Sequence, residues 1–234
     1  ETDVGEGRVS LTPADVEKLV AKGATVSIEQ GAGAQSSFPD AMYTDAGAAV
    51  VSKADVFKQD VVIKVRCPSS EELAKVENRA FLGMLSPLVN TELKAQLVSQ
   101  GATAFSMDML LRTLSRGQAF DVLSSQANMS GYRAVIEAGN AMQRPFAGQS
   151  TAAGKIPPTR VMVVGAGVAG LAAIQAAKNL GAVVTSFDVR AAAAEQVESM
   201  GARFLKVEVE EDGSGAGGYA KEMSPEWFAA ADKM

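Results

Sequence analysis

Three glycines with the spacing GxGxxG stand where a predicted strand passes into a predicted helix: Gly165, Gly167 and Gly170. The β-branched run Arg160–Val164 precedes them, and an apolar, alanine-rich stretch over residues 171–180 follows. In such a unit the first glycine makes a tight turn, the second lets the backbone approach a pyrophosphate, and the third lets the helix pack closely on the strand. Amide groups near Val168 would then direct the positive end of the helix at that anion.

An acidic residue follows the next predicted strand, Val183–Phe187. Asp188 lies about 20 residues beyond the glycines, where an acid binds the adenosine ribose hydroxyls of a dinucleotide. Its charge would repel a 2′-phosphate, which favours NAD over NADP. Arg190 instead favours NADP, because an arginine at this position can accommodate the 2′-phosphate. Strand, glycines, helix, second strand and acid occur in this order, so the sequence predicts a Rossmann-type NAD-binding unit.

A second group of polar residues precedes and begins a long predicted helix. Four of them are spaced so that they would share one helix face: Gln118, Asp121, Ser124 and Ser125. Arg112 and Arg116 come before them. One interpretation is a solvated helix start with an acid and serines near its first turn. The other is a polar wall of a cleft that faces the nicotinamide end of the cofactor.

Three charged residues nearer the N-terminus are further candidates: Glu6, Arg8 and Lys64. Lys64 lies in the otherwise apolar run over residues 61–65, and the carboxyl ends of strands face the ligand crevice in parallel sheets. The alternative is a lysine that buries its stem along the apolar surface and keeps its ammonium group in water.

Composition excludes several classes of site. The chain has 234 residues, a net charge of −5 and no histidine, which excludes His-based zinc sites, Ser-His-Asp triads and histidine general bases. A single cysteine, Cys67, excludes an intrachain disulfide and a multi-cysteine metal site, so we expect no metal. No basic surplus is present to neutralise phosphates, and we expect no nucleic-acid partner. No apolar run approaches the roughly 18 residues of a membrane span.

Predicted strands alternate with predicted helices, which indicates an α/β fold with parallel sheets. The strands are predicted over residues 24–29, 61–65, 80–85, 103–106, 160–164 and 183–187, and the helices include residues 39–46, 91–100 and a long one at 119–142. Residues 143–158 are predicted to form a loop, and so is the acidic, glycine-rich segment 208–218, alone typical of a linker. We therefore predict two Rossmann-like domains, 1–126 and 127–234, joined by the long helix, the second carrying GxGxxG.

Several stretches resemble the alanine dehydrogenase and proton-translocating transhydrogenase superfamily. RVSLTP at residues 8–13 is similar to its opening, and VIKVRCP at 62–68 to its next landmark. Three stretches resemble the transhydrogenase version specifically: LSRGQAFDVLSSQAN at 114–128, GYRAV at 131–135 and VGAGVAGLAAIQ at 164–175. GGYAKEM at 217–223 matches its mobile loop.

This resemblance implies the NAD(H)-binding component, domain I, of the Si-specific proton-translocating enzyme. NADP(H) would be bound by a partner, domain III, and protons would cross a membrane domain II. Hydride would pass directly between NADH and NADP⁺. The resemblance also implies a homodimer, peripheral on the inner membrane, at the cytoplasmic face in bacteria or the matrix face in mitochondria.

The family pattern also assigns individual residues. Gln118 would lie where the two cofactors meet, and three others would hold the dihydronicotinamide: Arg112, Asp121 and Ser124. The stretch from Gln118 to Asp121 would line the NAD site, which adds Ala119 and Phe120. Val168 would contact the pyrophosphate, and the adenosine ribose would be bound by Asp188, Val189 and Arg190. Gly218 and Tyr219 would belong to a loop that closes over NAD.

The chain departs from the family pattern in places. Gly117, Ala119 and Phe120 are not the side chains expected between the arginine and the aspartate, and residues 212–216 are unusually rich in glycine. A first strand is expected before Arg8, and further NAD-domain strands after Trp227. We therefore expect a fragment that binds NAD weakly or misfolds.

Three alternative functions remain. Alanine dehydrogenase shares the fold and uses a lysine, a role open to Lys64, together with a histidine, where this chain has residues 82–87 (LGMLSP). A non-catalytic NAD-binding module is the second alternative, although the polar residues from Arg112 to Ser124 argue against it. A purely structural α/β protein is the third, and the ordered dinucleotide fingerprint argues against that.

Overall fold

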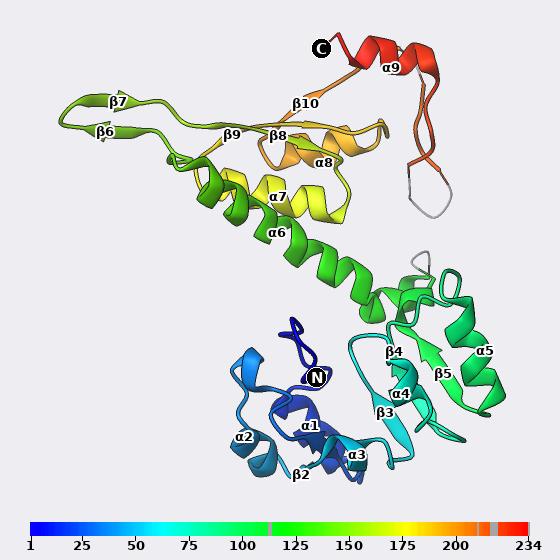
Figure 1. Ribbon diagram of the computed structural model, residues 1–234. Coiled ribbons are helices and arrows are strands. Elements are labelled where there is room, and N and C mark those ends of the chain that lie inside the picture. Colours follow the sequence, from blue (N-terminus) through cyan, green and yellow to red (C-terminus); the bar gives the residue numbers. More distant parts are fainter. Residues whose placement is uncertain (112–113, 210, 216–219, 234) are drawn as a thin grey trace. The chain divides into compact units, whose positions relative to one another are not determined.

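The computed structural model describes residues 1–111, 114–209, 211–215 and 220–233 (Figure 1). The chain divides into two compact units, Glu1–Leu111 and Arg112–Met234. Each unit is an α/β structure with parallel strands, as the sequence predicts.

The first unit contains short strands that alternate with helices. Among the described residues its strands form two parallel sheets, one of β1 and β2 and one in the order β3-β4-β5. Its elements are α1 (Pro13–Ala21), β1 (Ser27–Glu29), η1 (Ala34–Ser36), α2 (Asp40–Asp45), β2 (Ala49–Val51), α3 (Lys53–Val56), β3 (Val61–Ile63), α4 (Ser70–Leu73), β4 (Ala80–Gly83), α5 (Thr91–Ser99), β5 (Thr103–Ser106) and η2 (Met107–Met109).

Side-chain caps fix where α1 and α4 begin. Thr12 caps α1 and exchanges hydrogen bonds with Asp15 in a capping box, and Pro13 takes the first helical position. Ser69 and Glu72 form the same box at α4. These caps satisfy amides that the first helical turn leaves without a partner, so the two helices start at sequence-defined positions.

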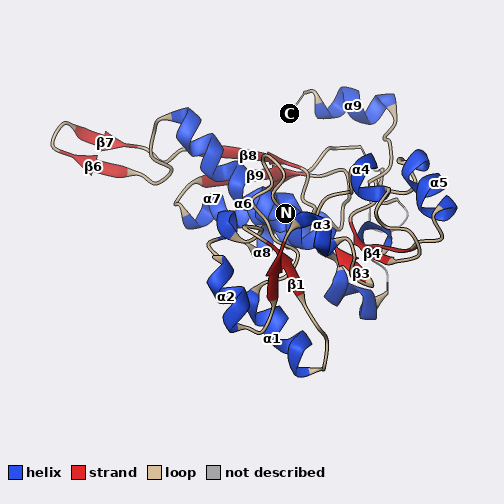
Figure 2. Ribbon diagram, turned by 60° about the horizontal axis from the view of Figure 1, so that its bottom comes forward, coloured by secondary structure: helices blue, strands red, loops and turns tan. Residues whose placement is uncertain are grey.

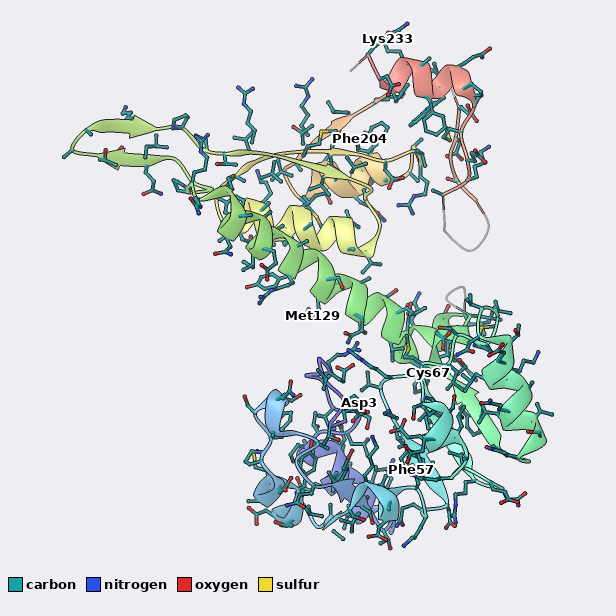
Figure 3. All side chains as sticks on the ribbon, viewed as in Figure 1. Asp3, Phe57, Cys67, Met129, Phe204 and Lys233 are labelled. Carbon is teal, nitrogen blue, oxygen red and sulfur yellow. The ribbon has the colours of Figure 1, made fainter. Side chains whose placement is uncertain are left out.

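Two apolar clusters hold the first unit together. One surrounds the fully buried Val16 and Tyr43, and the other surrounds Val76 and Phe81, to which Phe57 also belongs (Figure 3). A cavity of about 530 Å³ lies beside β1 and β3, whose residues line it together with apolar side chains from α1 and α3.

The second unit is built on one parallel sheet in the order β10-β9-β8, drawn in red in Figure 2. Its elements are η3 (Ser115–Phe120), α6 (Val122–Met142), β6 (Gln149–Thr151), β7 (Gly154–Ile156), β8 (Arg160–Val164), α7 (Val168–Asn179), β9 (Val183–Phe187), α8 (Ala193–Ser199), β10 (Arg203–Leu205) and α9 (Pro225–Ala231). The two strands of the fingerprint, β8 and β9, therefore form as predicted. They pair in parallel, with Arg160 opposite Val183 at one end and Val164 opposite Phe187 at the other.

Helix α6 packs along α7, which in turn covers the sheet (Figure 1). Gly131 and Val135 are the buried residues of α6, one turn apart, and they face the apolar core around Ile174 and Val184. Met129 lies on an exposed side of α6 (Figure 3). The small Gly131 allows the two helix backbones to meet, and it fixes α6 against the helix that follows the glycine turn.

Three expectations about segment boundaries were wrong. The long helix begins at Val122, not at residue 119, because Asp121 caps it and residues 115–120 form the tighter η3. Residues 143–158 contain an antiparallel hairpin, β6 with β7, instead of only a loop, and its residues are all exposed. The strands predicted at 24–29 and 61–65 span only Ser27–Glu29 and Val61–Ile63.

No helix within the described ranges is both long and apolar enough to cross a bilayer.

Candidate functional site

The GxGxxG segment forms a tight turn between β8 and α7. Gly165 has φ +93°, a backbone conformation that glycine adopts without strain, and its amide donates to the carbonyl of Phe187 at the end of β9. A Cβ on Gly170 would lie 1.7 Å from the carbonyl oxygen of Gly165, so only glycine allows α7 to start this close to the strand. The predicted tight turn and close helix packing are therefore both present.

The second glycine keeps the start of α7 open to a ligand. The nearest atom to a Cβ on Gly167 would be Nη2 of Arg190, 3.9 Å away. Gly167 is also the N-cap of α7, and it offers no side chain to accept from the first-turn amides of Val168 and its neighbours. Those amides and the positive end of the helix form a setting that suits a phosphate.

Asp188 lies beside this turn with its carboxylate almost fully buried, at 5% side-chain exposure. Oδ2 accepts from the amide of Ala166 at 2.6 Å and from Nη2 of Arg190 at 2.8 Å. Oδ1 accepts from the amide of Arg190 at 2.8 Å and from its Nε at 2.9 Å. The acid at the end of β9 is therefore held against the glycine turn by backbone and arginine together.

These contacts keep the acid ionised. Burial alone would raise the pKa of Asp188, but the hydrogen bonds from Arg190 and Ala166 outweigh burial, and the pKa lies below its ordinary value. Hydrogen bonding to Asp188 likewise raises the pKa of Arg190. The pair is a charged one at neutral pH, with the carboxylate available only as a hydrogen-bond acceptor.

A cavity of about 340 Å³ borders Asp188 and Val189 at the carboxyl ends of β9 and β10. Its walls are largely apolar and include Phe204 (Figure 3), Val207 and the buried Trp227. Sequence reasoning missed these wall residues, because they come from α9 and from the end of a short strand with no motif. The cavity is largely apolar and lies next to Asp188, so its lining suits a flat base.

The acidic, glycine-rich segment is anchored at the same place. The amide of Gly213 donates to the carbonyl of Val189 at 3.0 Å, and the amide of Lys221 donates to the carbonyl of Gly213 at 2.8 Å. A Cβ on Gly213 would lie 2.6 Å from Val189, which explains a glycine there. The base of the loop thus rests on the site. Gly218 and Tyr219, predicted to close over a ligand, lie outside the described residues.

The polar residues of the second group sit at the start of α6. Asp121 is the N-cap of α6, and its carboxylate accepts from the amide of Ser124 at 2.9 Å and from its hydroxyl at 2.6 Å. Gln118, Ala119 and Phe120 belong to η3 and contribute no buried residue. The structure therefore joins Asp121 to Ser124, while Gln118 contacts Asp121 through their backbones. Arg112 lies outside the described residues.

Lys64 belongs to a closed ring of charges in the first unit. Its ammonium lies 2.7 Å from Asp3 (Figure 3) and 2.8 Å from Glu72, and Lys53 bridges the same two acids at 3.4 and 2.8 Å. Burial alone would lower the pKa of Lys64, but these hydrogen bonds outweigh burial, so the pKa lies above its ordinary value. The side chain is only 10% exposed, so the alternative of an ammonium held in water was wrong.

Glu6 and Arg8, the other two charged candidates, are partners of each other. Glu6 is 2% exposed and holds both Arg8 and Arg66 at 2.8 Å. The hydrogen bonds from Arg8 lower the pKa of Glu6 to about 2. Glu72 also has a pKa of about 2, because hydrogen bonds from Lys53 and Lys64 outweigh its burial. Both acids thus stabilise the fold of the first unit.

Comparison with known proteins gives two family matches. "Alanine dehydrogenase/PNT, N-terminal domain" matches residues 1–130, and "Alanine dehydrogenase/PNT, C-terminal domain" matches residues 134–226. The NAD(P) transhydrogenase subunit alpha of Haemophilus influenzae is 46% identical over 98% of this chain and 45% of its own length. The NAD(P) transhydrogenase subunit alpha of Cereibacter sphaeroides is 49% identical over 95% of this chain and 43% of its own length.

Solved structures agree with these matches. The transhydrogenase of Sinorhizobium meliloti has a TM-score of 0.84 at 44% identity and covers 88% of this chain and 62% of its own. An L-alanine dehydrogenase has a TM-score of 0.76 at 29% identity, with 88% and 58% covered. The chain thus spans between 43% and 62% of the length of these four relatives. With both family domains matched in order, the chain belongs to the alanine dehydrogenase/PNT family.

Proposed function

We propose that this chain is the NAD(H)-binding component of a proton-translocating NAD(P) transhydrogenase. The observation that carries the proposal is the placement of Asp188 beside the open turn at Gly167, with the amide of Ala166 bound to its carboxylate. This is the arrangement by which a Rossmann unit binds a dinucleotide. The names of the relatives at 46% and 49% identity, NAD(P) transhydrogenase subunit alpha, support the specific enzyme.

The residues of the second unit fit the parts of NAD(H). The turn from Gly165 to Gly170 and the amide of Val168 would hold the pyrophosphate. Asp188, Val189 and Arg190 would bind the adenosine ribose, and the 340 Å³ cavity beside them would accept the adenine. Gly218 and Tyr219 would cover the bound molecule.

The start of α6 would hold the nicotinamide end. Asp121 is oriented by the amide and hydroxyl of Ser124, which keeps its carboxylate in one position. Gln118 and Phe120 are exposed and available for contact with a second nucleotide-binding partner. Arg112 and Ala119 complete the set that we propose from the family pattern.

Bound NADH supplies the hydride, and the residues of this chain orient the ring and keep water away. Direct transfer needs no general base, in agreement with a sequence that has no histidine. The acceptor NADP⁺ would be bound by a separate domain III, and coupling to protons would occur in a membrane domain II. We further propose a homodimer of the Si-specific type, peripheral on the inner membrane.

Alanine oxidation has less support. Lys64, the residue that such an activity would require, is paired with both Asp3 and Glu72 and has a raised pKa. A lysine in that state keeps its ammonium charge and is held inside the first unit by its two acidic partners.

Hydride exchange tests the proposal. This chain would be mixed with a recombinant NADP-binding domain III, NADH, the acetylpyridine analogue of NAD⁺ and catalytic NADP⁺. We expect turnover that Gln118→Ala or Asp121→Asn lowers by at least about a hundredfold. Glu137→Gln is the matched control, because Glu137 is an exposed residue of the same helix paired with Arg133. NADH binding without any turnover would contradict the transhydrogenase function and favour a binding module.

A further inference from the structure

The carboxylate of Asp188 is saturated with hydrogen bonds. A carboxylate offers about four acceptor sites. In this structure those sites are taken by the amide of Ala166, the amide of Arg190, and Nε and Nη2 of Arg190. A ribose diol that binds Asp188 needs acceptor sites of its own, so at least part of this set has to leave.

The backbone donors are fixed in place. Ala166 lies in the glycine turn and is 1% exposed, and its turn is tied to β9 through Gly165 and Phe187. On the other side, the carbonyl of Val189 accepts from Gly213 and the carbonyl of Arg190 accepts from Ala193. Removing either backbone amide from Asp188 would therefore break the turn or the start of α8.

The guanidinium of Arg190 is the part that can move. It belongs to a side chain that is 22% exposed, and it makes two parallel hydrogen bonds to Asp188. Its Nη2 lies 3.9 Å from where a Cβ on Gly167 would be, which places it over the turn that suits a phosphate. A short rotation would move the cation from one anion to the other.

We infer that Arg190 competes with the ribose for Asp188. Its guanidinium is bound to Asp188 in the ligand-free chain and moves to the diphosphate when a dinucleotide binds. The inference rests on the proposed NAD(H) site. It makes Arg190 a positioning residue with opposite effects on two parts of one ligand. The guanidinium of Arg190, which the family pattern assigns to the bound ribose, would instead oppose binding of the diol and favour binding of the phosphates.

Fragments of the ligand separate these effects. Adenosine has the diol and no phosphate, 2′,3′-dideoxyadenosine has neither, and ADP has both. Binding would be followed by fluorescence of the single tryptophan, Trp227, which lines the cavity beside Asp188. In Arg190→Met we expect adenosine to bind about tenfold more tightly than in the wild type, because no guanidinium then competes with the ribose for the Asp188 carboxylate. Dideoxyadenosine should bind as in the wild type, and the preference for ADP over adenosine should fall.

Arg160→Met is the matched control, since it removes the same charge from an exposed position at the other end of β8. If folded Arg190→Met bound adenosine no more tightly than the wild type does, and the wild type bound NADH, the inference would be overturned and the proposed site would stand. A wild type that does not bind NADH would overturn the proposed site and the inference with it.

A measurement on the wild type does not depend on the variant folding. The Nε–H group of Arg190 is hydrogen-bonded to Asp188 in the ligand-free chain, and its resonance should shift on saturation with adenosine. It should stay in place with dideoxyadenosine. An Nε–H resonance that stays in place at saturating adenosine would show that the guanidinium is not displaced.

Discussion

Gly131 of α6 lies directly against the backbone of Ala169 in α7. A Cβ built on Gly131 would be 1.9 Å from the carbonyl oxygen of Ala169, so no larger residue fits while the helices keep this distance. Ala169 belongs to the glycine-rich segment, and α6 starts at Val122, directly after its N-cap Asp121. This contact therefore fixes the helix that carries Asp121 and Ser124 onto the helix that begins at the candidate pyrophosphate turn.

Gly131→Ala should destabilise the second unit in spite of alanine's better helix propensity. Propensity contributes about 1 kcal/mol in favour of alanine. Separating two packed helices to admit a methyl group costs more, and we expect a net loss of about 1–3 kcal/mol. Chemical denaturation measures this difference. Ser130→Ala, at an exposed neighbouring position, should change the free energy of unfolding by no more than about 0.5 kcal/mol. Equal stability of Gly131→Ala and the wild type would contradict the contact.

The charge ring of the first unit should matter for stability and not for NADH binding. Lys64→Met leaves Glu72, at 5% side-chain exposure, with Lys53 as its remaining cation, and we expect a loss of about 3 kcal/mol. Lys58→Met is the control, because its pair with Asp55 is largely exposed and screened by water, so its loss should change the stability little. Titration of both variants with NADH completes the test. A large change in NADH affinity in folded Lys64→Met would place Lys64 in the ligand site instead.

Acid should destabilise the first unit through Glu6 and Glu72. Both have a folded pKa of about 2, below the ordinary value of 4.5. A lowered folded pKa stabilises the fold fully above the ordinary value, and this contribution is lost as the pH falls from about 4.5 towards 2. Thermal unfolding between pH 6 and pH 2 should show the loss. Glu72→Gln should be less stable at pH 6 but should lose less on acidification, and a variant with an unchanged pH profile would contradict the role of Glu72.

Local rules predicted the dinucleotide unit well. Gly165 and Gly170 are required by backbone conformation and by close approach, which are properties of a few neighbouring residues. The β-branched runs that form β8 and β9 are equally local signals. Helical spacing identified the polar residues around Asp121, and family resemblance then supplied their binding roles, which stay predictions.

What the sequence did not predict depends on tertiary contacts. The start of α6 at Val122 depends on the capping geometry of Asp121, which competed with a helical pattern that continued upstream. The ring of Lys64 with Asp3 and Glu72 joins residues up to 69 positions apart, and no periodicity reveals it. The bidentate contact between Arg190 and Asp188 is a choice of side-chain rotamer, on which a residue pattern has no bearing.

Asp188→Asn should change which nucleotide the chain prefers. The amide keeps the shape of the side chain but loses the charge that holds Arg190 and accepts the ribose hydroxyls, so NADH affinity should fall about tenfold. The same change removes the repulsion of a 2′-phosphate and leaves the guanidinium of Arg190 able to pair with it. NADPH should therefore bind more tightly than to the wild type. Titrations with both nucleotides give the ratio of affinities, and Glu195→Gln, an equal charge change at an exposed position on α8, is the control. If Asp188→Asn lost NADH affinity and gained none for NADPH, Arg190 would not pair with a 2′-phosphate at this site, and the loss of the Asp188 charge would not change the nucleotide preference.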